Sequence, residues 1–282
     1  MGSISIEIKI FQSYSKNKAT MDIDDDGGRL EAVWLGPAPE VAPTLIFLHE
    51  GLGCVALWRD IPARLAKMTG CGALVYSRRG YGASAPCRLP RPIDFMHREG
   101  QVVLPKVIQQ CGIRDHILIG HSDGGSIALI NAGDRPAPGL AGVVTLAAHV
   151  FCEKITCRSI EDARRRYLNE DLKARLAVYH GENTDCAFWG WNDVWLHPDF
   201  LRWNIEAFLP SIQVPVLAVQ GVDDPYGTAA QIEAIRRGAK DRVSAKMIAD
   251  CGHAPHLEQS DIVLPIIRDF VSACLINPSK AR

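Results

Sequence analysis

The chain has 282 residues, a formal net charge of −1 at pH 7 and nine cysteines. This near-balance of charge argues against nucleic-acid binding and against attraction to a membrane surface, because both require a basic patch. No apolar run approaches the roughly 18–20 residues of a membrane span, and the first 30 residues lack the pattern of a secretory signal. The cysteines show neither CxxC pairs nor metal-ligand spacing, so we expect reduced side chains and a cytoplasmic location.

Short apolar runs alternate with helical patterns along the chain. Alternating apolar residues predict strands at 4–10 and 30–35. Nearly continuous apolar runs, typical of parallel strands covered on both faces, lie at 44–49, 72–77, 116–121, 142–148 and 215–220. Helical patterns lie around 57–69, 93–112, 124–133, 228–238 and 258–275. We therefore expect an α/β fold with a mostly parallel, doubly wound sheet of about eight strands.

One segment, residues 149–211, interrupts this alternation. It contains no strand-like run and consists of a charged helical stretch followed by a tryptophan-rich one. We expect it to form a helical cap over the carboxyl edge of the sheet, where open α/β sheets bind ligands. The chain would then divide into this cap and a core built from residues 1–148 and 212–282.

Ser122 lies between glycines in GHSDGG (120–125), where a predicted strand gives way to a predicted helix. The G-x-S-x-G pattern at such a junction is typical of a nucleophile elbow. The glycines permit a tight turn that lifts the hydroxyl above the sheet, and the next helix directs its amino end at a developing oxyanion. The pattern alone is weak because Gly-Ser turns are common. The strand and helix on either side favour a nucleophile over a plain turn residue.

Three further stretches stand where a serine hydrolase needs them. Segment 48–60 is a glycine-containing loop after the first buried strand, where a backbone N–H can donate to a substrate carbonyl. Segment 219–227 follows the strand after the cap and offers an acid, and segment 251–259 offers a histidine. Serine, acid and histidine in this chain order distinguish one hydrolase architecture from the chymotrypsin-like and subtilisin-like orders.

Together these motifs resemble those of the α/β-hydrolase fold superfamily, and the resemblance covers roughly residues 28–275. SRRGYGAS (77–84) resembles the Arg-Gly-x-Gly-x-Ser segment of such proteins, and G-x-x-D and G-H-x-P resemble their acid and base motifs. The resemblance implies that Ser122 is the nucleophile, Asp224 the acid and His253 the base. It also implies that the cap is inserted before the strand that bears the acid.

Two neighbouring residues compete for these roles. Asp223 directly precedes Asp224, but the Gly-x-x-Asp register that starts at Gly221 selects Asp224 and leaves Asp223 as an exposed turn residue. His256 lies three residues after His253, and the Gly-His-x-Pro register favours His253. Neither neighbour is expected to take part in the chemistry.

The resemblance further implies an oxyanion hole formed by the backbone N–H groups of Gly51 and Asp123. Glu50 departs from the family pattern, which usually has glycine there. It is either a surface residue or a carboxylate that reaches the pocket and disfavours anionic substrates. The acidic side chain of Asp123 suits the amino end of a helix, so helix capping suffices to explain it.

Substrate contacts are expected from aromatic residues around the cleft. Trp58, at the start of the first helix, could wall the pocket, and His149, which ends the strand before the cap, either contacts substrate or packs in the core. In the cap, Trp189, Trp191 and Trp195 are either cap core or pocket lining. A cleft that needs an apolar wall favours at least one of them as lining.

The implied chemistry is acyl transfer, in which His253 deprotonates Ser122, Asp224 orients the histidine and water releases the acyl group. It requires no metal and no organic cofactor, and the expected partner is a small-molecule substrate. We expect a hydrolase of small, mostly apolar carboxylic esters or lactones. One alternative is a carbon–carbon bond hydrolase of ring-cleavage products, although those commonly carry Asn and Met where this chain has His121 and Asp123. The other is a ligand receptor on the same fold.

Overall fold

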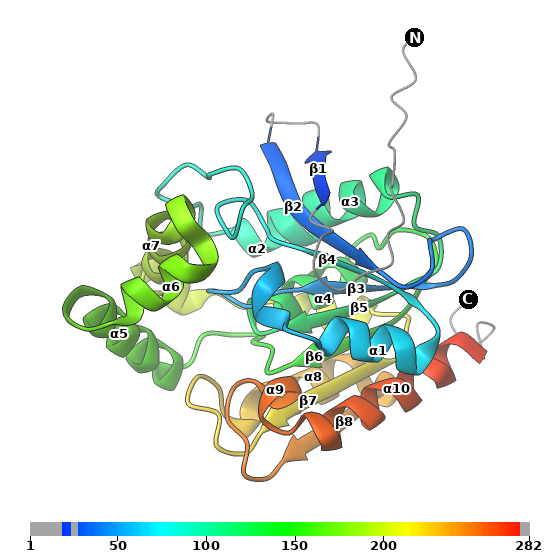
Figure 1. The fold of residues 1–282 in the computed structure, drawn as a ribbon. Coiled ribbons are helices and arrows are strands. Elements are labelled where there is room, and N and C mark those ends of the chain that lie inside the picture. Colours follow the sequence, from blue (N-terminus) through cyan, green and yellow to red (C-terminus); the bar gives the residue numbers. More distant parts are fainter. Residues whose placement is uncertain (1–18, 24–27, 277–282) are drawn as a thin grey trace.

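The computed structural model describes residues 19–23 and 28–276 (Figure 1). Within these residues one eight-stranded sheet has the order β1-β2-β4-β3-β5-β6-β7-β8. β2 pairs antiparallel with β1 and β4, and all other neighbours are parallel. The strands are β1 (Ala19–Ile23), β2 (Gly28–Leu35), β3 (Thr44–Leu48), β4 (Gly72–Tyr76), β5 (His116–His121), β6 (Leu140–Leu146), β7 (Val216–Gly221) and β8 (Val243–Ile248). The predicted α/β class and mostly parallel sheet are confirmed, while the strand predicted at 4–10 lies outside the described residues.

Helices cover both faces of the sheet. Successive residues of a buried strand point to opposite faces, so Leu45 and Phe47 pack toward α1 and α10, whereas Ile46 and Leu48 pack toward α3, α4 and α8. Both sides of the parallel strands β3 to β7 are therefore apolar, which explains the continuous apolar runs, whereas the edge strand β8 is partly exposed. The helices on the sheet are α1 (Ile61–Thr69), α2 (Phe95–Arg98), α3 (Leu104–Gln110), α4 (Asp123–Gly133), α8 (Ala229–Ala239), α9 (Pro255–Glu258) and α10 (Ser260–Ile276).

Three helices fill the connection between β6 and β7, and Figure 1 shows them grouped on one side of the sheet: α5 (Lys154–Asn169), α6 (Leu172–His180) and α7 (Thr184–Trp195). Short 3-10 helices, the last of which packs against α4 and α8, complete the connection. The division into core and cap at residues 149 and 211 stays a prediction. Within the part of the chain that the structure describes, no helix is long and apolar enough to cross a membrane.

The position of β3 creates the crevice in which the site lies. β3 pairs with β4 on one side and with β5 on the other. The chain leaves β3 toward α1 on one face and leaves β5 toward α4 on the opposite face. At such a switch point the two connections diverge and leave a crevice at the carboxyl ends of the strands, where ligands bind in open α/β sheets.

Candidate active site

Ser122 occupies the tight turn between β5 and α4. Its backbone has φ 50° and ψ −117°, a conformation that costs a residue with a side chain on the order of 1–3 kcal/mol. The flanking glycines make the turn possible. A Cβ on Gly120 would lie 2.2 Å from the carbonyl oxygen of Gly124, and one on Gly124 would lie 1.9 Å from that of Leu48. The N–H of Ser122 donates to the carbonyl of Leu146 at 2.8 Å, which ties the turn to β6.

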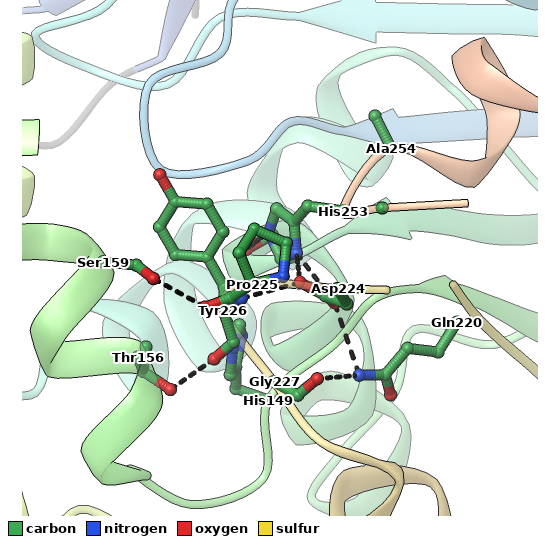
Figure 2. Close-up of polar contacts among 12 residues, drawn as sticks. His149, Thr156, Ser159, Gln220, Asp224, Pro225, Tyr226, Gly227, His253 and Ala254 are labelled. Carbon is green, nitrogen blue, oxygen red and sulfur yellow. Dashed lines mark hydrogen bonds and ion pairs between the residues drawn. The ribbon is translucent and has the colours of Figure 1, made fainter. Parts of the chain in front are cut away.

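The structure brings Ser122, His253 and Asp224 together. The Ser122 Oγ lies 2.9 Å from His253 Nε2. His253 Nδ1 lies 2.8 and 2.9 Å from the two carboxylate oxygens of Asp224 (Figure 2). Because a carboxylate only accepts hydrogen bonds, Nδ1 must be the donor. In the neutral ring Nε2 is then an acceptor, aligned to take the proton of the serine hydroxyl.

Asp224 lies in a loop after β7 and its side chain is buried. One oxygen accepts from the Tyr226 N–H at 2.8 Å and the other from Gln220 Nε2 at 3.3 Å. Burial alone would raise the pKa of Asp224, but the hydrogen bond and charge of His253 outweigh it and lower the pKa. Asp223, the competing acid, is exposed to solvent.

The loop that carries Asp224 is held by the helix α5 and by His149, which lies just after β6. Figure 2 shows Thr156 and Ser159 of α5 pointing to this loop, where Thr156 Oγ1 donates to the Tyr226 carbonyl and Ser159 Oγ donates to that of Pro225 at 2.6 Å. His149 Nε2 donates to the Tyr226 carbonyl at 3.1 Å. Three side chains from outside the sheet thus fix the backbone next to the acid.

The loop after β3 is also fixed through its backbone. The buried guanidinium of Arg78 donates to the carbonyl oxygens of His49 and Glu50. The Arg78 N–H donates to His49 Nε2 at 2.9 Å, and His49 Nδ1 donates to the Glu50 carbonyl at 2.7 Å. A Cβ on Gly51 would lie 2.2 Å from the ring of Trp191, so only glycine fits there. Arg78 belongs to the segment 77–84 noted in the sequence, but its contacts with this loop were not anticipated.

Asp123 begins α4, where the first N–H groups of a helix have no acceptor within the helix. Its backbone N–H therefore remains able to bind an oxyanion. Helix capping does not suffice to explain its side chain, contrary to the expectation, because the carboxyl group is fully buried and accepts from Trp195 Nε1 at 3.1 Å. Burial raises the pKa of Asp123.

A cavity of ≈ 100 Å³ adjoins Ser122 and His253. Trp191 and Trp195 of α7 contribute to its wall, and so does Tyr226, whose ring centroid lies 4.7 Å from that of His253. The backbone residues expected to form the oxyanion hole lie in the same lining. Ser122, His253 and an apolar wall thus share one small space.

Two polar residues also line this cavity. His149 does so as expected, and burial, followed by the charge of His253, lowers its pKa to about 4. Glu50 is the other, which agrees with the pocket position among the two alternatives left open by the sequence, and its side chain is 25 % exposed. Its Oε2 lies 3.3 Å from His121 Nδ1.

The structure corrects two expected substrate contacts, because neither Trp58 nor Trp189 is among the described residues that line the cavity. Trp58 is turned toward the sheet, where its ring centroid lies 5.1 Å from Phe47 and 5.0 Å from His256. Trp189 packs against Tyr167 of α5. Both therefore contribute to packing rather than to the pocket.

Solved structures with low sequence identity share this fold. An esterase (EaEST) from Exiguobacterium antarcticum is 16% identical, with a TM-score of 0.73 over 90% of this chain and 99% of that chain. A proline iminopeptidase from Mycobacterium smegmatis is 18% identical, with a TM-score of 0.70 over 93% and 100%. The esterase RhEst1 from Rhodococcus sp. ECU1013 is 19% identical, with a TM-score of 0.68 over 89% and 98%.

A sequence model of the alpha/beta hydrolase family matches residues 45–265, from β3 to within α10. With its sheet order, its serine turn and this match over most of its length, the chain belongs to the alpha/beta hydrolase family.

Proposed function

We propose that the protein is a serine hydrolase that cleaves a small, mostly apolar carboxylic ester or lactone through an acyl-enzyme. The observation that carries this proposal is the hydrogen-bonded chain from Ser122 through His253 to Asp224, with its serine end at the cavity. The direction of each hydrogen bond agrees with the roles that the family resemblance implies, because His253 Nδ1 donates to Asp224 and Nε2 can accept the proton of Ser122. Similar folds in proteins described as esterases add support.

The size and lining of the cavity favour a small acyl group. Pockets for drug-sized ligands measure roughly 300–1,000 Å³, whereas this cavity measures ≈ 100 Å³. Trp191 and Trp195 offer an apolar wall, and Glu50 in the same lining has its carboxylate beside His121. A short, mostly apolar acyl chain fits these constraints best.

In the proposed mechanism, Ser122 Oγ attacks the substrate carbonyl while His253 Nε2 takes its proton. The N–H groups of Gly51 and Asp123 bind the oxyanion, and Asp224 stabilises the imidazolium. His253 then gives the proton to the departing alkoxide, which leaves as an alcohol. A water molecule, deprotonated by His253, attacks the acyl-enzyme. As the bond between the acyl carbon and Ser122 Oγ breaks, His253 returns the proton to Oγ and the carboxylic acid departs.

The test combines covalent labelling with turnover. A fluorophosphonate should add to Ser122 in the wild type, as located by peptide mass spectrometry, and 4-nitrophenyl acetate should be hydrolysed over many turnovers. Ser122→Ala should lose the label and about 10⁴–10⁶ in kcat, whereas Ser211→Ala, at an exposed serine, should keep both. Equal labelling of wild type and Ser122→Ala contradicts the assignment. Labelling without turnover of esters or lactones favours a ligand receptor instead.

A further inference from the structure

Glu50 and His121 meet beside the proposed base. His121 is the last residue of β5, directly before the serine, and only 4% of it is exposed. Its Nδ1 lies 3.3 Å from the carboxylate of Glu50, and its Nε2 lies 2.8 Å from the backbone carbonyl oxygen of His253. The histidine therefore bridges the loop after β3 and the loop that carries His253.

The backbone carbonyl of His253 is an acceptor, and so is Glu50 when its side chain is ionised. A neutral imidazole has one N–H and can donate to only one of them, whereas an imidazolium donates to both. A neutral ring would leave a buried nitrogen lone pair facing an oxygen. With Glu50 ionised, only the imidazolium form of His121 satisfies both oxygens. A protonated Glu50 would instead donate to a neutral ring, and the lowered pKa of Glu50 argues against that state.

The electrostatic surroundings agree with this charge state. Burial alone would lower the pKa of His121, but the hydrogen bond and charge of Glu50 outweigh it and raise the pKa. Burial would likewise raise the pKa of Glu50, and His121 instead holds it far below its usual value. Each charge is thus maintained by the other.

The remaining titratable groups around His121 come from the loops after β7 and β8 and from α9. The His256 ring centroid lies 4.7 Å away, and burial, followed by the charge of His121, keeps the pKa of His256 well below the usual value, so that this ring stays neutral. The His253 ring centroid lies 5.2 Å away. The carboxylate of Asp224 further favours the cation. The charges of Glu50 and Asp224 thus both favour a cationic His121, which has two imidazole neighbours.

We propose that Glu50 and His121 form a charged positioning pair that fixes the backbone of the base at His253. This inference rests on the proposed function, because it concerns the same base. Asp224 holds the ring of His253 while His121 holds its carbonyl, so two anchors from different loops define where Nε2 lies relative to Ser122. A displacement of about 1 Å at a reacting group can cost on the order of 10² in rate.

The proposed pair should make the labelling rate of Ser122 depend on pH. As pH rises through the raised pKa of His121, the ring loses a proton and releases either Glu50 or the His253 carbonyl. The rate at which a fluorophosphonate labels Ser122 should therefore reach a maximum and then fall by roughly threefold or more at alkaline pH. The labelling rate is measured from pH 6 to 10, with correction for spontaneous reagent hydrolysis.

Two variants remove the charged pair. In Glu50→Gln the amide can turn its NH₂ toward a neutral His121 Nδ1, so the bond to the His253 carbonyl no longer depends on a titrating proton. In His121→Gln no ring titrates. Both variants should lose the alkaline fall in labelling rate, and Glu50→Asp should retain it. His116→Gln, which removes another buried histidine of β5, should also retain it.

A second readout needs no enzyme activity. The ring nitrogens of His121 are assigned by ¹⁵N NMR through their absence in His121→Gln, and they should show imidazolium shifts at pH 7.5. Neutral-ring shifts at that pH overturn the proposal, as does an alkaline fall that persists unchanged in both charge-removing variants. If the wild type is not labelled at all, the proposed function fails and the positioning role fails with it. The NMR result still decides the charge of the pair.

Discussion

Replacing Asp224 by asparagine separates the charge of the acid from its shape. The two Asp224 oxygens each face a donor besides His253 Nδ1, namely the Tyr226 N–H at 2.8 Å and Gln220 Nε2 at 3.3 Å. The NH₂ of an asparagine would therefore meet a donor in either orientation. Gln220 cannot simply turn over, because its Nε2 also donates to the Gly227 carbonyl at 2.7 Å.

The expected loss follows from this geometry. Without the negative charge, the imidazolium formed during attack loses a charge-assisted partner whose side chain is only 1% exposed, so water screens little of the effect. An NH₂ facing Nδ1 also favours the tautomer in which Nε2 carries the proton and cannot accept one. In the serine-protease example this substitution costs about 10⁴ in kcat. For Asp224→Asn we expect a loss of roughly 10²–10⁴, equivalent to about 3–5 kcal/mol.

The assay is kcat for 4-nitrophenyl acetate at pH 8, with near-UV circular dichroism to verify the fold of each variant. Asp223→Asn is the matched control, because Asp223 is adjacent in sequence but exposed, and it should lose less than about tenfold. The reverse ranking in two folded variants would refute the reasoning and move the acid one residue earlier. Equal small losses would show that the charge at Asp224 contributes little.

Three further predictions concern the surroundings of the site. Trp191→Ala should shift kcat/KM toward bulkier acyl groups by roughly tenfold relative to acetate, whereas Trp189→Ala, away from the cavity, should leave the ratio of these values unchanged. Gly124→Ala should lower Tm by roughly 3–10 °C, because its Cβ meets backbone at 1.9 Å. Gly190→Ala should lower Tm less, since its Cβ meets mainly the flexible Arg91 side chain. Arg78→Met should reduce the free energy of unfolding by roughly 2–3 kcal/mol in urea titration, because the buried carbonyl of His49 and the part-buried carbonyl of Glu50 lose their donor.

The sheet and the serine turn could be predicted because their signals are local. A strand covered on both faces needs apolar residues at every position, and this produces continuous runs such as TLIFL in β3 and HILIG in β5. The turn at Ser122 needs glycine where the backbones of β3, β5 and α4 meet, and these glycines are visible in GHSDGG. In both cases the structural requirement, burial of both strand faces or glycine at a close backbone approach, determines residues that are neighbours in the sequence.

The tryptophans show a signal that sequence reasoning could have used. Residues four apart in a helix share a face, so Trp191 and Trp195 of α7 lie on one side, and both line the cavity. Trp189 is two positions before Trp191 and points away by about 200°. Trp58 offered no such signal, because it precedes α1 and its direction depends on how the chain packs against the sheet.

Contacts between segments that are distant in the chain could not be predicted from the sequence. Glu50 and His121 are 71 residues apart, and Arg78 reaches the loop after β3 from the end of β4. No spacing rule relates such positions, because their proximity follows from the strand order of the sheet. The choice between a surface role and a pocket role for Glu50 therefore depended on the structure.

Two hydroxyl groups of α5 donate to the loop that carries Asp224, and this matters for protein engineering. Exchanging the segment between β6 and β7 for that of a relative is an obvious way to change substrate selectivity. Such a chimaera would also remove the donors to the carbonyls of Pro225 and Tyr226, which Thr156 and Ser159 provide. Selectivity and turnover would then change together, unless the grafted segment carries hydroxyl side chains at both places.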